Sequence, residues 1–313
     1  MLKQLLNFAA SLITTLVGLG LFALGIGLVL LEYEHPTLAI APGFLILLIN
    51  LICAILVKEK IRRNNSLLVF HLSLLTLMLL IMASRLTYMK GWLQVNEGET
   101  FQEITGILHQ GPYHINQVED NAFRQLNYQT HIEHGSRTET KSYVAIPNTK
   151  EPYIIRDQTP LKLGAYQFTL SAHIGYSLSF NWQSGFSHHE GFVRLPAYSR
   201  HTMQTQEWLI PNTEIKLNLL LDMDTDSSMQ GDFKIPERYQ LIIFHQQQKI
   251  HLKVGESYRF DSGILTFQGL KRWIGYDVFY DWSIPWLLAT CLLAIASLGS
   301  FLWQKVNQNR WDD

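Results

Sequence analysis

The chain has 313 residues, of which 47% are hydrophobic and 16% are charged, and its formal net charge is −1. The near balance of 25 basic and 26 acidic residues gives no basis for nucleic-acid binding. The mean hydropathy is only +0.05 because the apolar residues are concentrated in a few blocks, a pattern that predicts a membrane protein carrying a polar domain.

The apolar residues form four blocks, each close to the length that crosses a bilayer. A helix needs about 20 apolar residues to span about 30 Å of hydrocarbon, at about 1.5 Å per residue. The first block follows the basic residue Lys3, as in a secretory signal, but it is too long and lacks a small-residue cleavage site. We therefore expect an uncleaved span there. The expected transmembrane spans are residues 10–31, 38–57, 67–83 and 284–303.

Basic residues in the short connections predict the orientation of these spans. Lys58, Lys60, Arg62 and Arg63 lie between the second and third spans, whereas the first connection contains two glutamates. The positive-inside rule then predicts that this basic loop and both termini are cytoplasmic. The predicted domains are a three-helix transmembrane region (1–90), an extracytoplasmic domain (91–283), and a fourth helix with a short cytoplasmic tail (284–313).

The extracytoplasmic region has the signals of β-strands. Four segments, separated by Gly, Pro, Asn and Asp, are rich in strand-forming residues: 161–171, 214–221, 239–244 and 263–268. We expect an antiparallel β-sandwich or an irregular barrel, with a mobile loop at 222–236. The predicted fold class is therefore α plus β: four transmembrane helices with a large β-rich extracytoplasmic domain between helices three and four.

His71 lies inside the third apolar block. A charged side chain at the centre of a membrane helix costs about 2.5–3.5 kcal/mol, so we expect a neutral imidazole with a partner. Imidazole is a common ligand of haem iron, but a histidine can also bond a neighbouring helix, and the two interpretations stand about equal. Met78 and Met82 share the helical face of His71, where packing is their usual role. Asn50, in the second span, is expected to bond another helix.

The other histidines do not have the spacing of a metal site. Ten of the twelve lie in residues 91–283. The strand pattern puts His131 and Glu133 on one face and His134 on the other, and the sequence 188–190 lacks the spacing of a zinc protease. The acidic stretch 222–232 lacks the glycine and glutamate positions of a calcium loop. We interpret these residues as solvated surface groups.

The cysteines also restrict the chemistry. Cys53 and Cys291 both lie in apolar blocks, so the extracytoplasmic domain contains no thiol and cannot exchange disulfides. A Cys-x-x-Cys-His motif is missing from the sequence, so the chain does not itself carry covalently attached c-type haem.

Five segments of the chain carry a resemblance to a known family: Phe70–Leu75, Gly91–Phe101, Ile154–Gly164, Val254–Glu256 and Gly275–Asp281. Together they resemble the ResB family of cytochrome c biogenesis proteins. The arrangement of three spans, a large extracytoplasmic domain and a fourth span agrees with that family over nearly the whole chain.

The resemblance implies a subunit of a system II cytochrome c synthetase in the bacterial inner (plasma) membrane. Such a subunit helps move haem across the membrane and present it for attachment to apocytochrome c, together with a CcsA-like membrane partner. His71 corresponds to the family's transmembrane histidine, proposed to ligate haem iron opposite a histidine of the partner. Haem would be bound transiently and shared with that partner. The chain would be an accessory subunit of a haem lyase complex, with no catalytic residue of its own.

Two other functions remain open. The chain could be a scaffold that binds no haem and positions the partner, with His71 bonding a neighbouring helix. It could also be a membrane-anchored extracytoplasmic receptor, which predicts a concave apolar pocket within residues 91–283.

Overall fold

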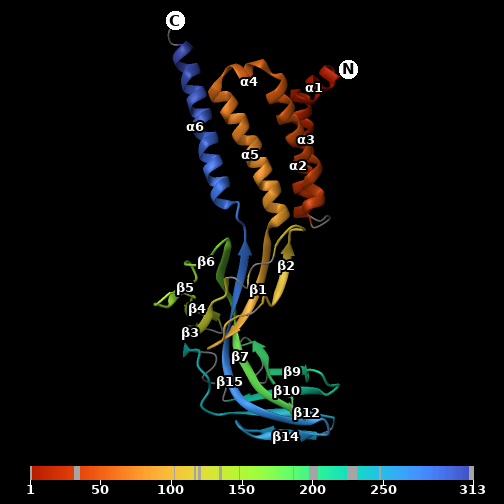
Figure 1. The fold of residues 1–313 in the computed structure, drawn as a ribbon, viewed down its shortest axis with the longest axis vertical. Helices are drawn as coiled ribbons and strands as arrows, with labels where there is room; N and C mark the ends of the chain where they lie inside the picture. Colours follow the sequence, from red (N-terminus) through yellow and green to blue (C-terminus); the bar gives the residue numbers. More distant parts are fainter. Residues whose placement is uncertain are drawn as a thin grey trace. The chain divides into compact units, whose positions relative to one another are not determined.

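A computed structural model describes residues 2–31, 36–101, 103–115, 118, 121–133, 136–147, 149–185, 187–196, 204–223, 231–246 and 248–309. The chain divides into two compact units. The helical unit comprises residues 1–87 and 281–313, and the β unit comprises residues 88–280. Figure 1 shows the helices of the first unit and the strands of the second.

The helical unit contains the four long apolar helices that the sequence predicts. α5 ends four residues beyond the expected span because residues 84–87 continue the helix past the apolar block. A break at Ala10 and Ser11 separates α1 from α2, and the Ser11 hydroxyl accepts a hydrogen bond from the Thr14 backbone N–H at 3.2 Å, capping α2. The helices are α1 (Leu2–Ala9), α2 (Leu12–Leu30), α3 (Pro36–Val57), α4 (Glu59–Arg63), α5 (Asn65–Thr87) and α6 (Ile284–Asn309).

The long helices present apolar side chains outward. Leu12 is 73% exposed, Leu288 is 63% exposed and Ile295 is 69% exposed. A water-soluble bundle would turn such side chains toward a core and present polar ones to solvent. The length of these helices and their apolar surfaces together indicate a membrane protein.

α2 and α3 pack with their backbones in close approach. A Cβ atom at Gly25 would lie 2.3 Å from the Ala39 carbonyl oxygen, and one at Gly43 would lie 2.4 Å from the Phe22 backbone nitrogen. Only glycine fits at these two positions. Such small-residue contacts are typical of helices that associate in a bilayer.

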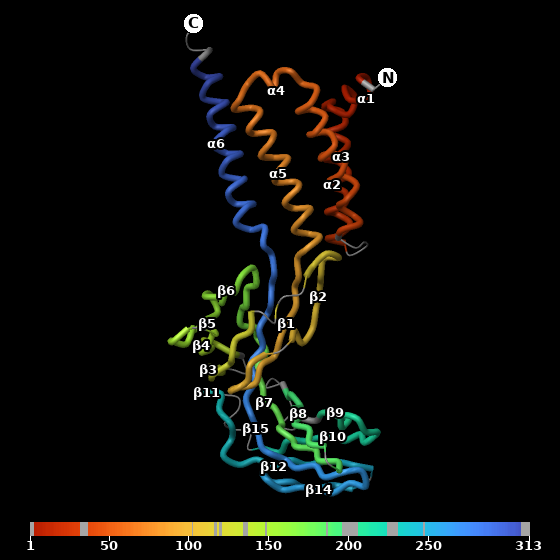
Figure 2. The backbone as a smooth tube through the Cα atoms, in the orientation of Figure 1, coloured from red at the N-terminus to blue at the C-terminus, as the bar shows by residue number. Residues whose placement is uncertain are grey.

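α5 packs against α6 through small and polar residues. Ser73, Ala294 and Ser297 are buried along these two helices. Toward the C-terminal end of α6, the Ser66 and Ser300 hydroxyls are 3.2 Å apart, and the Gln304 amide donates to the Ser66 hydroxyl at 3.2 Å. On its other side α5 meets α3, so that α5 is the central helix of the unit (Figure 2).

The strands of the β unit pair antiparallel throughout, as predicted, and they form three sheets. A seven-stranded sheet has the order β2-β1-β15-β7-β6, with β14 and β8 pairing off that path, and the four-stranded sheets are β13-β12-β10-β9 and β11-β3-β4-β5. The strands are β1 (Met89–Asn96), β2 (Gly106–Gln110), β3 (Arg124–Glu133), β4 (Ser136–Ala145), β5 (Tyr153–Arg156), β6 (Leu161–Leu163), β7 (Tyr166–Ser184), β8 (Ser187–Pro196), β9 (Gln204–Leu209), β10 (Lys216–Met223), β11 (Gly231–Asp232), β12 (Tyr239–His245), β13 (Gln248–Leu252), β14 (Ser257–Phe260) and β15 (Gly263–Tyr280).

Two strands are much longer than the sequence predicts. The predicted strand 161–171 is divided at Gly164, which has a φ of +59°, into β6 and a β7 of 19 residues. The predicted strand 263–268 continues to Tyr280 as β15, through two β-bulges. Bulges and glycines bend a long strand without ending it. Of the predicted loop 222–236, residues 224–230 lie outside the described part, and 231–232 form β11.

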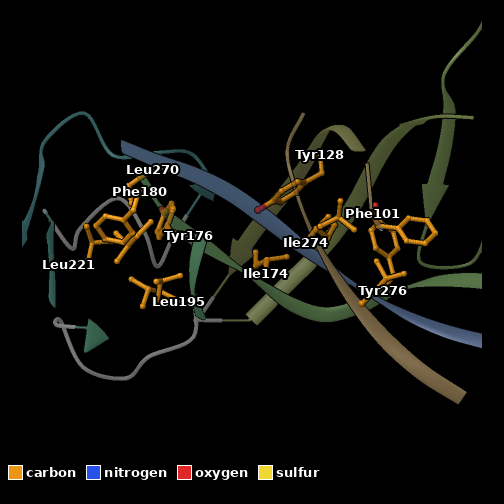
Figure 3. Packing of buried hydrophobic residues seen from close by; sticks show 14 of the residues in the cluster. Phe101, Tyr128, Ile174, Tyr176, Phe180, Leu195, Leu221, Leu270, Ile274 and Tyr276 are labelled. Carbon is orange, nitrogen blue, oxygen red and sulfur yellow. The ribbon is translucent and has the colours of Figure 1, made fainter. Parts of the chain in front are cut away.

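The core of the β unit follows β7 and β15 along their length (Figure 3). Tyr276 is fully buried on β15, where its hydroxyl bonds the Ser142 hydroxyl at 2.6 Å and donates to the Gln125 side-chain oxygen. The Trp273 indole covers Gly175 on β7 and donates to the Leu195 carbonyl at 3.0 Å. The buried polar groups of Tyr276 and Trp273 are thus hydrogen-bonded within the core, which stabilises the packing of β15 on its neighbours.

Candidate functional site

His71 lies on α5 and is half-buried. Its Nδ1 is 2.7 Å from the backbone carbonyl oxygen of Leu67, one helical turn earlier, and the Phe70 ring meets the imidazole edge to face at 5.4 Å. A carbonyl oxygen can only accept a hydrogen bond, so the proton of the neutral imidazole is on Nδ1. The other ring nitrogen, Nε2, then carries a lone pair.

This arrangement is the one that a metal-binding histidine usually has. Histidines that ligate metals almost always donate from the second ring nitrogen to a carbonyl or carboxylate, which fixes both the tautomer and the ring orientation. The hydrogen bond of His71 is made within its own helix. Among the described residues no hydrogen bond joins His71 to a second helix, so the interhelical bond considered above has no support in the geometry.

Asn50 does bond other helices, as the sequence predicts. Its amide donates to the carbonyl oxygens of Ala9 at 2.6 Å and Ser11 at 3.1 Å, and its side-chain oxygen accepts from the Thr15 hydroxyl at 3.0 Å. These partners lie at the break between α1 and α2, where carbonyl groups lose their helical partners. The prediction of an interhelical role for Asn50 is therefore confirmed.

Met78 and Met82 follow His71 by about two and three turns of α5. Met78 is half-buried and Met82 is 37% exposed. Neither position distinguishes an axial ligand from a packing residue.

A cavity of about 600 Å³ lies beside Leu67, the residue whose carbonyl holds His71. Three basic side chains line it, and the single acidic group, Glu59, pairs with Arg63 at 2.7 Å. The sequence analysis used these basic residues only for topology. The sequence shows cations both in α4 and in the last turns of α6, and the packing of α6 on α5 brings them together around the cavity. The lining residues are Glu59, Lys60, Arg63, Asn64, Leu67, Phe301, Gln304 and Lys305.

The segment Gly91–Phe101, which carries much of the family resemblance, has a structural role. It forms β1 and a turn at Gly98, which has a φ of +83°. Both oxygens of Glu97 accept from the Arg272 guanidinium, at 2.9 and 2.5 Å, and Glu99 pairs with Lys271 at 2.9 Å. The two ion pairs fasten this turn to β15.

Asp281, at the end of the Gly275–Asp281 segment, is also structural. Its carboxylate accepts from the Ser283 backbone N–H at 2.8 Å and from the Ser84 hydroxyl at 2.9 Å. The Ser283 carbonyl in turn begins the hydrogen bonding of α6. Asp281 therefore stabilises the start of α6 and ties it to the end of α5.

Two cavities in the β unit have linings that mix polar and apolar residues. One of about 690 Å³ contains Arg272, which Glu97 neutralises, beside Tyr128 and Lys234. Burial raises the pKa of Tyr128, so its hydroxyl stays protonated and donates to the Trp273 carbonyl. The other, of about 490 Å³, is lined by Trp182, Ser184, Ser187, His189, Pro211, Asn212, Thr213, Glu214, Ile215 and Ser262.

The described histidines of the β unit form no cluster with other metal-ligating side chains. In the described part of the chain no three His, Cys, Asp or Glu side chains lie together as a metal site would require. His131 and Glu133 share a face of β3, and His131 is 3.3 Å from Asp232, whose pKa is lowered by hydrogen bonds from His131 and Lys234. His134 lies outside the described residues, and His188 and His189 lie on β8.

Comparison with known proteins gives no match: no family model matches the sequence, and no curated protein matches it. The candidate site is therefore defined by geometry, with His71, its tautomer and the basic cavity at one end of α5 as its parts.

Proposed function

We propose that this protein is a haem-handling subunit of a cytochrome c synthetase in a bacterial inner membrane. In this proposal it receives haem from the cytoplasmic side and, with a CcsA-like partner, presents it for attachment to apocytochrome c. Haem is the cargo, and His71 is the iron ligand that this chain supplies.

The observation that carries the proposal is the hydrogen bond between His71 Nδ1 and the Leu67 carbonyl, at 2.7 Å. It makes Nε2 the basic nitrogen, and Nε2 is the atom that would bind iron. An unpaired ring nitrogen in an apolar helix costs free energy unless a ligand or a partner protein meets it. Ligation of iron satisfies this nitrogen without placing a charge on the imidazole.

The cavity beside Leu67 supports the direction of transfer. Glu59 pairs with Arg63 and not with Lys60 or Lys305. These two lysines line the cavity, which includes Leu67, one helical turn from His71. Haem carries two carboxylates, which cations attract at the edge of a bilayer. We infer that the cavity receives these carboxylates while the porphyrin approaches the bundle. This role requires that the cavity faces the cytoplasm, as the positive-inside rule predicts.

The β unit fits a docking role better than a chemical one. It contains no cysteine, so it cannot reduce the thiols of apocytochrome c by disulfide exchange. We infer that the partner supplies the second axial ligand, and that the β unit helps to hold the client.

Haem absorbance of the protein purified with its membrane partner tests the proposal. We expect His71→Gly to lower bound haem and cytochrome maturation together, and added imidazole to restore part of both by entering the space left by the side chain. Thr76→Val is the matched control, since Thr76 is an exposed polar residue of α5 that bonds only the Leu72 carbonyl. His71→Ala with an unchanged haem spectrum, in a complex that still assembles, would refute the ligand role.

Reporter fusions test the orientation on which the proposal depends. A periplasmic reporter fused at Asn127 should be active, and one fused at Asn64 should be inactive. The reverse pattern would refute both the orientation and the cytoplasmic position of the basic cavity.

The scaffold remains the second candidate, because a specific set of contacts favours it. The hydroxyl and amide ladder of α5 and α6 and the bond between Ser84 and Asp281 stabilise these helices independently of any ligand. A scaffold predicts that the partner's stability in the membrane depends on this chain while haem content is insensitive to His71.

A further inference from the structure

The loop that follows β2 has one side chain turned inward and two turned outward. The His114 ring packs 4.8 Å from the Tyr280 ring, and its Nε2 lies 3.3 Å from the Tyr166 hydroxyl. Its neighbours Tyr113 and Ile115 are 70% and 72% exposed. The loop is thus fixed from within and presents two large side chains outside.

The loop lies beside the residues at which the chain enters and leaves the β unit. The Gly111 backbone N–H donates to the Tyr88 carbonyl at 2.9 Å. Tyr88 directly follows Thr87, the last residue of α5, in the chain. Tyr280, against which His114 packs, precedes Asp281 and the start of α6. The loop is therefore attached to residues that directly follow α5 and precede α6 in the chain.

Those helix ends are expected at the surface of the hydrocarbon layer. α5 has 23 residues, which gives a length of about 34 Å against about 30 Å of hydrocarbon. The Trp282 indole donates to the Thr87 hydroxyl at 2.8 Å, and Trp286 on the first turns of α6 is exposed. Tryptophan and tyrosine are enriched at this depth, where a polar tip meets the headgroups and an apolar body meets the acyl chains.

The composition of the segment fits lipid. Residues 106–115 contain no Asp, Glu, Lys or Arg. Ile107 and Leu108 on the edge strand β2 are each about half exposed, at 53% and 52%. Edge strands in water usually carry charges that prevent association. An edge strand that has no Asp, Glu, Lys or Arg and exposes Ile107 and Leu108 can instead be covered by lipid.

We propose that the loop Gly111–Ile115 and the outer face of β2 form a membrane-contact surface, with Tyr113 and Ile115 inserted among the lipids of the outer leaflet. This surface would fix the orientation of the β unit above the bilayer. It is independent of haem and of the function proposed above.

Spin-label accessibility in the full-length protein tests the surface. Cys53 and Cys291 are replaced by Ser, single cysteines are introduced at Tyr113 or Ile115, and the nitroxide-labelled protein is reconstituted in phosphatidylcholine vesicles. Val254 is the matched control, because it is an exposed apolar residue, 53% exposed, in the turn between β13 and β14. Two labelled positions are used so that the test remains valid if one variant does not fold.

The ratio of collisions with oxygen to collisions with a water-soluble nickel chelate should be several-fold higher at 113 and 115 than at 254, because oxygen concentrates in lipid. Equal ratios at all three positions would overturn the proposal. Exclusion of both reagents from 113 and 115 would also overturn it, since the surface would then be covered by protein.

Discussion

The helical unit joins its helices in two different ways. α2 and α3 meet backbone to backbone at glycines, and the buried amide of Asn50 has all its contacts within the fold. α5 and α6 meet through hydroxyl and amide side chains, and α5 carries His71, whose Nε2 has no hydrogen bond to a described residue. Asn50 and His71 are thus two different kinds of polar residue in an apolar helix: the first bonds other helices, and the second bonds only its own helix among the described residues.

The difference follows from how helices associate in lipid. Lipid is as apolar as leucine, so close packing and satisfied hydrogen bonds must supply the free energy of association. Asn50 supplies such bonds, and we therefore interpret it as structural. Among the described residues His71 adds no bond between helices, and this is the reason that we propose a ligand for it.

The largest effect is expected where the two backbones touch. A valine at Gly43 would place Cβ 2.4 Å from the Phe22 backbone nitrogen, and a backbone atom cannot move aside as a side chain can. Overpacking usually costs about 1–3 kcal/mol, and we expect Gly43→Val to destabilise the protein by about 3 kcal/mol or more. The thermal midpoint in detergent and the yield of folded protein measure this effect.

Gly27→Ala is the control for that experiment. A Cβ at Gly27 meets nothing within 4 Å, so alanine should stabilise α2 by about 0.5–1 kcal/mol through helix propensity. If both variants have the thermal midpoint of the parent protein, the close contact between α2 and α3 is wrong.

A smaller loss is expected from the buried amide. Asn50→Leu removes the bonds to Ala9, Ser11 and Thr15 and leaves two carbonyl oxygens without their donor. Hydrogen bonds between membrane helices contribute about 0.6 kcal/mol each on average, so we expect a loss of about 1–2 kcal/mol. Thermal unfolding of the haem-free protein measures it. Thr290→Val is the control, because the Thr290 hydroxyl bonds only its own helix; equal losses in the two variants would contradict the structural role of Asn50.

The sequence predicted the helical unit better than the β unit. Four helices are visible as blocks because lipid requires a long run of apolar residues. The length of β15 was not visible, because Gly269 and Gly275 look like strand ends, whereas the structure accommodates them at bulges. Pairing with β7, more than 80 residues away, holds that strand together, and a local pattern does not contain this information.

The candidate site was predicted only in part. His71 stands out as an ionisable residue in an apolar run, but its tautomer depends on the rotamer that brings Nδ1 to the Leu67 carbonyl. The basic cavity combines α4 with Lys305, residues almost 250 positions apart, so only the packing of α6 on α5 reveals it. The ion pairs of Glu97 and Glu99 were likewise hidden, since their partners lie on β15.

A still smaller effect on stability is expected at His71. His71→Ala replaces a side chain bonded only within its helix by the best helix former, so the free energy of unfolding of the haem-free protein should change by no more than about 0.5 kcal/mol. Bound haem should nevertheless fall in the complex with the partner. The unfolding free energies of His71→Ala and Asn50→Leu should be measured under the same conditions, so that the two losses of stability can be compared directly. A loss of stability at His71 as large as that at Asn50 would show that both residues are structural.

The smallest effect on cytochrome maturation is expected from the two thiols, one in each helix pair. Cys53 is buried in α3, and Cys291 is exposed on α6. Cys53→Ala removes one buried sulfur and should cost about 1 kcal/mol or less, whereas Cys291→Ala should leave the thermal midpoint unchanged. Cytochrome maturation in cells carrying both changes should match the parent, since in the proposed function neither thiol takes part in redox chemistry. If a double variant that still folds loses maturation, at least one of the two thiols has a redox role, and our interpretation of both cysteines as packing residues is wrong.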